Sequence, residues 1–222
     1  MNLLSSTTVF SFYTMLSRVL GYFRDILIAI FLGTSIYADA FFVAFRLPNT
    51  FRRLFAEGTF NAAFIPSYTA ENIKGKIQGK RFADEVLTLL TLALLSIVLL
   101  VEIFTPYVVY LIAPGFIEDT TKFNLAIDLT RITFPFLAFV SLSSFFAGIL
   151  NSRNKFAAAA AAPIFLNLIL ILSLVISYYL KLDYALNLSY GVSLSGLIQL
   201  LFLILFASKY YQPSLVFKNK IR

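Results

Sequence analysis

The chain carries, at Ile164–Leu180, the stretch IFLNLILILSLVISYYL, which contains no charged side chain. Val86–Val101 and Phe134–Ile149 are two further uncharged runs made largely of Leu, Ile, Val, Phe and Ala. A helix needs about 20 mostly apolar residues to cross the roughly 30 Å of hydrocarbon in a bilayer. Runs of this kind predict an all-α protein that crosses a membrane several times. The short alternating segments of a membrane β-barrel are not seen.

The composition agrees with a membrane protein and disfavours several functional classes. Of the 222 residues, 59% are hydrophobic and 13% are charged, and the mean hydropathy is +0.85. A soluble domain has about 25% charged residues. Because the chain has no Cys and no His, disulfides and the usual zinc ligands are missing, and we expect no cofactor. The net charge of +7 does not form a soluble basic face, so we expect no nucleic-acid partner.

Residues 1–208 are predicted to form one lobe of about six transmembrane helices. The basic segment 209–222 follows as a cytoplasmic tail or as the start of a linker to a second lobe. The first span lacks the charged leading segment of a cleaved signal peptide, so we expect it to be retained. We expect an interfacial helix within Phe55–Gly79, a solvated linker at Lys74–Lys80, and a kink at Pro135 in the fourth span. The six predicted spans are Val9–Leu32, Ala38–Phe55, Phe82–Ala113, Phe123–Leu150, Phe156–Leu180 and Leu186–Ala207.

Positive charges in the predicted connections lie almost entirely on one side of the membrane. Twelve Lys and Arg fall on that side and two on the other. Cytoplasmic connections carry the excess of Lys and Arg in membrane proteins, so we expect both termini of this segment in the cytoplasm. The twelve are Arg52, Arg53, Lys74, Lys76, Lys80, Arg81, Arg153, Lys155, Lys209, Lys218, Lys220 and Arg222; the two are Lys122 and Lys181.

Ionisable residues inside the first span indicate a functional surface, because a charge at the bilayer centre costs about 2.5–3.5 kcal/mol on insertion scales. Arg18 and Asp25 are seven residues apart and share one helix face, with Gly21 between them. Arg24 points about 120° away on a straight helix, and a bend at Gly21 would bring it toward the same space. A purely structural ion pair between Arg18 and Asp25 is the alternative.

The second span is also rich in charge. Asp39, Arg46 and Arg53 recur every seven residues, and Asn49 belongs to the same stripe. Arg52 lies off this stripe near the cytoplasmic end, where arginines often reach lipid phosphates. The fifth and sixth spans carry no charge, and we expect them to pack against other helices or to face lipid.

The polar surface of the first two spans is therefore mainly cationic. Arginine suits phosphate because its guanidinium is a permanently charged, planar fork of donors. An arginine-lined cavity open to the cytoplasm predicts a phosphate-bearing amphiphile as cargo. The residues alone leave open a phospholipid, a polyprenyl pyrophosphate or a polar anionic solute.

Five segments, in order along the chain, resemble the MurJ (MviN) family of the multidrug/oligosaccharidyl-lipid/polysaccharide (MOP) superfamily. They are LSRVLGYFRD (Leu16–Asp25), ADAF (Ala38–Phe41), RLPNTFRRLFAEG (Arg46–Gly58), RITFP (Arg131–Pro135) and GILNSRNKFA (Gly148–Ala157). The resemblance implies a flippase, not an enzyme, in the bacterial inner membrane. Its cargo would be lipid II, the undecaprenyl-pyrophosphate-linked disaccharide-pentapeptide, moved from the inner to the outer leaflet by alternating access for peptidoglycan synthesis.

The resemblance also implies which residues bind the substrate. Arg18, Arg24 and Arg52 match the arginines proposed to hold the pyrophosphate. Other positions of the cavity or its gate match Asp25, Asp39, Asn49 and Glu57, and the charge pattern adds Arg46.

The family is expected to have about fourteen helices in two lobes, so this chain resembles the amino-terminal lobe alone. Either it is a fragment or a truncated product, or another chain supplies the second lobe; lipid II and membrane lipids are the other expected partners. Two alternatives remain: a related MOP exporter of drugs or other lipid-linked glycans, which the arginine excess disfavours, and a non-transporting membrane subunit. No nucleophile–base set, acid/base pair or metal cluster predicts an enzyme.

Overall fold

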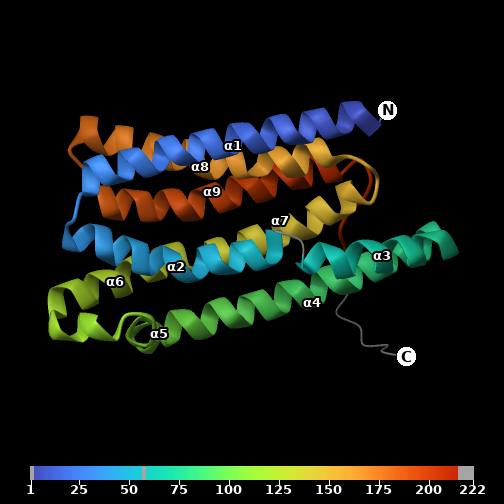
Figure 1. Ribbon diagram of the computed structural model, residues 1–222. Helices are drawn as coiled ribbons and strands as arrows, with labels where there is room; N and C mark the ends of the chain where they lie inside the picture. The colour runs from blue at the N-terminus through green and yellow to red at the C-terminus, as the bar shows by residue number, and fades with distance from the viewer. Residues whose placement is uncertain (1–2, 57–58, 215–222) are drawn as a thin grey trace.

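The computed structural model describes residues 3–56 and 59–214, and the side chains of residues 8–52 and 60–214. This part of the chain is a set of helices joined by short turns, which confirms the predicted all-α class (Figure 1). The helices are α1 (Leu3–Leu32), α2 (Ile36–Ala56), α3 (Thr59–Lys74), α4 (Lys76–Ile103), α5 (Thr105–Ile112), the 3-10 helix η1 (Pro114–Glu118), α6 (Thr120–Thr133), α7 (Phe136–Asn151), α8 (Phe156–Leu180) and α9 (Tyr184–Ala207).

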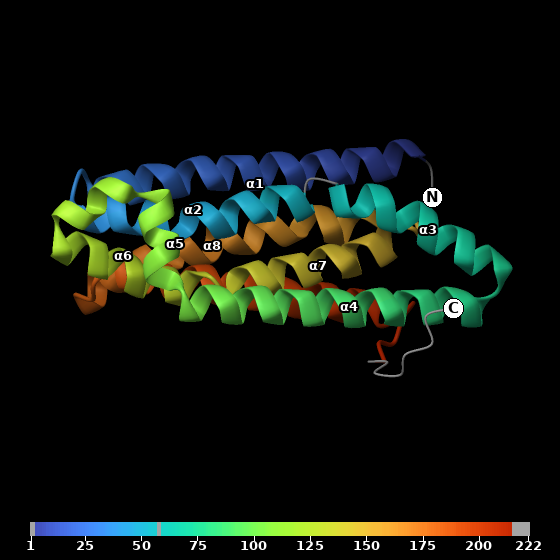
Figure 2. The same cartoon turned by 90° about the horizontal axis from the view of Figure 1, so that it is seen from below.

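The long helices run side by side as a bundle (Figures 1 and 2). α1 lies along α8, α9 packs against both α8 and α7, and α2 packs on α6 and α7. α3 and α4 pack on each other and against α7. α1 begins and α9 ends at the same end of the bundle, where the α3–α4 and α7–α8 turns also lie (Figure 1). We call this the basic end, because Lys74, Lys76, Arg153, Lys155 and Lys209 lie in or beside these turns.

Two large clusters of buried apolar side chains hold most of the bundle together, and a smaller third one is formed by Leu94, Phe134 and Leu137. One joins α1, α2, α5, α6, α7, α8 and α9 through residues that include Phe41, Leu129 and Leu188. The other, nearer the basic end, joins α3, α4, α7, α8 and α9, and the rings of Phe64 and Phe145 meet there at 5.0 Å. Close packing of this kind is what associates helices in a membrane, where lipid tails are as apolar as the side chains.

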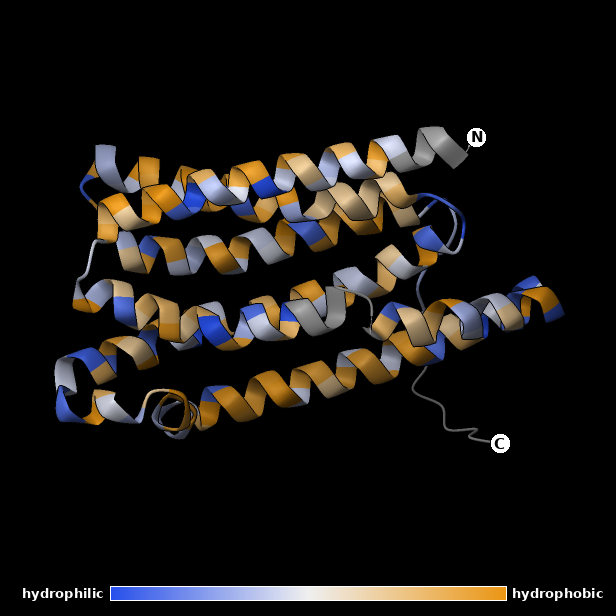
Figure 3. Ribbon diagram, viewed as in Figure 1, coloured by the Kyte–Doolittle hydropathy of each residue, from blue (hydrophilic) through white to orange (hydrophobic). Residues whose placement is uncertain are grey.

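The outer surface of the bundle is suited to lipid. Four helical segments of the described chain are long and apolar enough to cross a membrane: α4, α6 with α7, α8 and α9. α4 exposes Leu89, Leu95 and Leu99, and it is apolar along most of its length (Figure 3). α1 and α2, of 30 and 21 residues, run alongside these segments but carry the charges noted above. The count of six spans therefore stays a prediction.

The structure corrects the solvated linker predicted at Lys74–Lys80. α3 ends at Lys74 and α4 begins at Lys76, so Gly75 alone separates the two helices. Gly79 lies inside α4, where a Cβ atom would be 2.9 Å from the Asn72 Cα of α3. The glycine thus permits two helices to approach closely and does not mark a flexible connection. α3 itself is the helix expected within Phe55–Gly79, and its interfacial position stays a prediction.

Two predicted spans are interrupted at prolines. The third, Phe82–Ala113, is divided, because α4 ends at Ile103 and α5 begins at Thr105. Pro106 lies in the first turn of α5, where an N–H group would have no acceptor within the helix, so its absence costs no hydrogen bond. The fourth span breaks between α6 and α7 at Phe134 and Pro135, as the proline predicts. Thr133 Oγ1 donates to the Ala44 carbonyl at 2.9 Å, which ties this break to α2.

Candidate functional site

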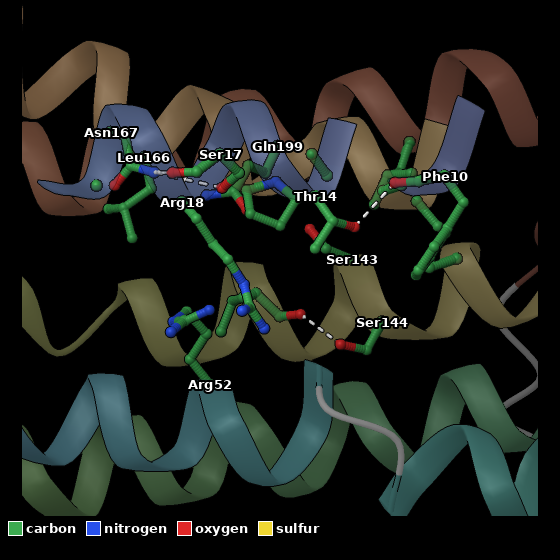
Figure 4. A pocket seen from close by; sticks show the side chains of 18 of the residues that line it. Phe10, Thr14, Ser17, Arg18, Arg52, Ser143, Ser144, Leu166, Asn167 and Gln199 are labelled. Carbon is green, nitrogen blue, oxygen red and sulfur yellow. Dashed lines mark hydrogen bonds between the residues drawn. The ribbon is translucent and has the colours of Figure 1, made fainter. Parts of the chain in front are cut away.

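A cavity of about 610 Å³ lies between α1 and α8 on one side and α2 and α7 on the other (Figure 4). Small side chains leave this space open, among them Ala159 and Ala160 on α8 and Ser143 and Ser144 on α7. The alanine-rich start of α8 therefore allows more than close helix packing. It also forms part of the wall of a polar cavity.

Arg24 enters the cavity from α1 in a fixed orientation. Its Nη1 donates to Asn167 Oδ1 of α8 at 2.8 Å, while its Nε and Nη2 donate to Asp25 Oδ1 at 2.9 and 2.7 Å. Asn167 in turn donates from Nδ2 to the Ser17 carbonyl at 2.8 Å. Asn167 is buried and Arg24 is largely buried, so these contacts join α1 to α8 and aim the guanidinium.

Asp25 therefore pairs with its neighbour Arg24, and the alternative ion pair with Arg18 is not formed. α1 continues as a helix through Gly21, so no break is needed to bring Arg24 into the cavity. Gly21 faces Asn167, with a Cβ position 3.6 Å from the Asn167 amide nitrogen. Arg24 reaches the cavity because α8 lies along this side of α1.

Arg18 and Arg52 complete the cationic lining. Arg18 extends from α1 and Arg52 from α2, and the two side chains point toward the same space (Figure 4). Arg52 Nε donates to Asn49 Oδ1 at 3.0 Å, so Asn49 orients Arg52 from one turn earlier in α2. No described carboxylate lies within ion-pair distance of Arg18.

The charge of the cavity is one-sided. Three arginines line it, and none of the other described residues that line it is an Asp or a Glu. The remaining polar lining consists of Ser, Thr, Asn and Gln side chains, which carry no charge. Such a space attracts an anion, and its planar donor forks fit phosphate oxygens in particular.

The structure places the other predicted site residues outside this cavity. Asp39 accepts a hydrogen bond from Lys122 of α6, at the end of the bundle opposite the basic end. Arg46 is exposed on α2 and does not line the cavity. Glu57 lies outside the described residues. Asp25 and Asn49 contact cavity arginines without being part of the lining themselves.

Two functional candidates were missed in the sequence because their spans carry no charge. Asn167 of α8 and Gln199 of α9 both line the cavity and both are buried. These two helices pack against their neighbours and expose apolar side chains as expected, and in addition each supplies an amide to the cavity. An amide inside an uncharged span was the available signal, because polar side chains within a membrane helix face partners or cavities rather than lipid.

The fold and the cavity together define a multi-pass helical membrane protein with an arginine-lined cavity inside its helical bundle. The family model described as lipid II flippase MurJ matches residues 28–221. The chain belongs to the lipid II flippase MurJ family.

Individual relatives agree with this assignment. A probable lipid II flippase MurJ of Rhizobium tropici is 49% identical over 160 residues, which are 71% of this chain and 30% of that protein. The corresponding protein of Buchnera aphidicola subsp. Acyrthosiphon pisum is 39% identical over 212 residues, 94% of this chain and 41% of the relative. A solved structure of lipid II flippase MurJ in an inward closed conformation superimposes with a TM-score of 0.81 at 28% identity, over 94% of this chain and 43% of that one. The chain thus spans less than half the length of each of these relatives.

Proposed function

We propose that this chain forms the amino-terminal lobe of a lipid II flippase and binds the pyrophosphate of lipid II through Arg18, Arg24 and Arg52. The observation that carries the proposal is the convergence of these three guanidinium groups, from two helices, on one cavity without a carboxylate in its lining. A pyrophosphate offers several charged oxygens, which match the several donors that three arginines present.

The contacts of each arginine suggest a division of roles. Arg24 is already oriented by Asp25 and Asn167, and Arg52 by Asn49, so little side-chain entropy is lost when these two groups bind an anion. Arg18 has no described carboxylate partner, so its whole charge is available to the substrate. The prenyl chain stays in the lipid while the head group occupies the cavity.

Transport by alternating access requires a second lobe, on the same or another chain, that moves against this one. An inside-negative membrane potential favours outward movement of an anion by about 2.3 kcal/mol per charge per 100 mV. We place the protein in the bacterial inner membrane with the basic end in the cytoplasm. The gathering of Lys74, Lys76, Arg153, Lys155 and Lys209 at one end of the bundle supports this orientation.

The proposal is tested by Arg18→Gln and Arg24→Gln in the protein as the cell makes it, with Arg131→Gln as control. Arg131 is exposed on α6 and does not line the cavity. Each cavity variant loses hydrogen bonds to a charged group, so its affinity for undecaprenyl pyrophosphate should fall by about tenfold or more. The amount of lipid II in the outer leaflet should fall as well. Unchanged binding and unchanged outer-leaflet lipid II in both cavity variants would remove these arginines from the mechanism.

A competition experiment separates this function from drug export. Purified protein is offered undecaprenyl pyrophosphate in the presence of a cationic dye. The cationic cavity predicts that the dye does not displace the lipid, because arginines repel a cation. Displacement by the dye would favour the drug-exporter alternative.

A further inference from the structure

A second pocket, of about 340 Å³, lies at the basic end of the bundle and shares no lining residue with the arginine cavity. It is formed where α7 ends, α8 begins and α9 ends, beside the first turns of α1. Two lysines line it, Lys155 and Lys209. The mechanism proposed above makes no use of this pocket.

The rest of its wall is mainly apolar and opens outward. Val9, Phe156 and Phe206 line the pocket, together with alanines from the start of α8. Phe206 is 50% exposed and Val9 37% exposed, so part of this apolar wall lies on the outer surface of the bundle. In a membrane that surface contacts acyl chains. The pocket thus combines a lipid-facing wall with two cationic groups.

The carboxylates described at the basic end are already engaged by other cations. Glu71 pairs with Lys74, Asp84 with Lys80, and Glu85 with Arg81. No described carboxylate lies within ion-pair distance of Lys155 or Lys209. The pocket therefore has a surplus of two positive charges, which a bound anion would balance.

The surface next to the pocket extends this surplus. Tyr210 lines the pocket and also lines a neighbouring one, of about 210 Å³, which contains Lys76 and Arg153. Like the two lysines, Lys76 and Arg153 have no described ion-pair partner. Anionic head groups near the pocket therefore meet further positive charge on the far side of Tyr210.

We propose that this pocket binds an anionic membrane phospholipid, with its phosphate on Lys155 and Lys209 and an acyl chain along Val9, Phe156 and Phe206. Lysine ammonium groups are compact charges that attract phosphate without demanding one fixed geometry. The apolar wall distinguishes a lipid from a soluble phosphate ester, which would contact the lysines alone. Because the pocket spans three helix ends, the bound lipid would stabilise the packing of α7, α8 and α9.

The test uses the full purified chain in detergent, titrated with phosphatidylglycerol and with phosphatidylcholine of the same acyl chains, and read by native mass spectrometry. Each lysine near an anionic lipid contributes about a fivefold gain in affinity, so Lys155→Gln/Lys209→Gln predicts about 30-fold weaker binding of phosphatidylglycerol. Phe206→Ala should weaken the binding of both lipids, because it removes part of the apolar wall. The control Arg131→Gln/Lys181→Gln removes the same charge from exposed positions outside the pocket and should change neither.

Soluble glycerol phosphate gives the third arm, since it carries the phosphate without the chains. Weak binding of this head group beside tight binding of phosphatidylglycerol supports the proposal, provided that the lysine variant keeps its helical circular dichroism. Three results would overturn it: equal binding of both lipids by the unmodified chain, an undiminished affinity in the lysine variant, or glycerol phosphate binding as tightly as the lipid. The last result would indicate a site for soluble phosphate esters.

Discussion

Asn167 shows how one uncharged side chain can organise a cationic site. Its side-chain oxygen accepts a hydrogen bond from Arg24, and its amide nitrogen donates one to the Ser17 carbonyl. The residue therefore orients a cavity arginine and also joins α1 to α8. A buried donor or acceptor that loses its partner costs about 1–3 kcal/mol. One amide thus stabilises the contact between α1 and α8 and orients an arginine of the proposed pyrophosphate site.

We expect Asn167→Ala to lower the free energy of unfolding by about 1–3 kcal/mol and to weaken pyrophosphate binding, because Arg24 loses an orienting partner. Asn187→Ala is the matched control: Asn187 also donates to α8, through the buried Ser173 carbonyl and Ser177 Oγ, but it does not line the cavity. Thermal unfolding and binding of undecaprenyl pyrophosphate measure the two effects. If Asn187→Ala weakens binding as much as Asn167→Ala does, Asn167 has no specific role in the site.

Tyr211 gives a prediction on pH. Burial, together with the hydrogen bond that its hydroxyl donates to Asp84 at 2.6 Å, raises the pKa of Tyr211 above its ordinary value of 10.0. The unfolded state therefore loses this proton first, and the free energy of unfolding falls as the pH rises above about 10.

Tyr211→Phe should reduce this fall between about pH 8 and about pH 11, as measured by thermal unfolding at several pH values. The variant should still fold, since Asp84 keeps Lys80 and Ser214 as donors. The same dependence on pH in both proteins would show that Tyr211 is not the group responsible.

The cationic half of the site could be predicted from the sequence, and the amide half could not. Arg18 and Arg24 stood out because charge is costly inside a span, whereas Arg52 was assigned to the site by the family resemblance. The pairing of Asp25 with Arg24 could not be chosen over pairing with Arg18, because the choice depends on how α1 lies on α8. Asn167 carries no charge, and its role follows only from that same contact.

At the scale of helices, uncharged runs predicted α8 and α9 well, because a long apolar run indicates a membrane helix whatever the helix packs against. The predicted span Phe156–Leu180 has the bounds of α8 itself. The predicted linker at Lys74–Lys80 was wrong because glycine in a sequence indicates flexibility and close packing equally. Only the position of Asn72 on α3 shows that Gly79 serves close packing.

The substitution Gly79→Ala tests whether Gly79 serves flexibility or close helix packing. In an isolated helix alanine is favoured over glycine by about 1 kcal/mol. At this position the new Cβ would lie 2.9 Å from Asn72 Cα, and overpacking costs about 1–3 kcal/mol, so we expect a net loss of stability.

Thermal unfolding of Gly79→Ala and of the control Gly115→Ala checks this prediction. A Cβ at Gly115 meets no atom within 4 Å, so that variant should unfold at about the temperature of the unmodified chain. A higher unfolding temperature for Gly79→Ala would mean that α3 and α4 do not cross closely there.

At the scale of the whole molecule, the two ends of the bundle should lie on opposite sides of the membrane. The chain has no cysteine, so single cysteines can be introduced without a background of other thiols. Ser208 and Glu118 are exposed residues just after α9 and at the end of η1. They lie at the basic end and at the opposite end of the bundle.

We expect Glu118→Cys to react with a membrane-impermeant thiol reagent once the outer membrane is made permeable. Ser208→Cys should react only after the inner membrane is disrupted. The reason is the excess of Lys and Arg at the basic end, which favours the cytoplasm. Mass spectrometry of the labelled protein measures both. Labelling in the reverse order would invert the proposed orientation.

Arg18 and Arg24 belong to the same uninterrupted α1, six residues apart, which separates their backbones by about 9 Å along the helix axis. They therefore extend into the same cavity from two different depths along α1. A diphosphate arriving from the basic end would meet Arg18 first and could be passed on to Arg24 without ever leaving positive charge. Two arginines in succession would divide the electrostatic barrier to moving the diphosphate into the bilayer into two smaller barriers.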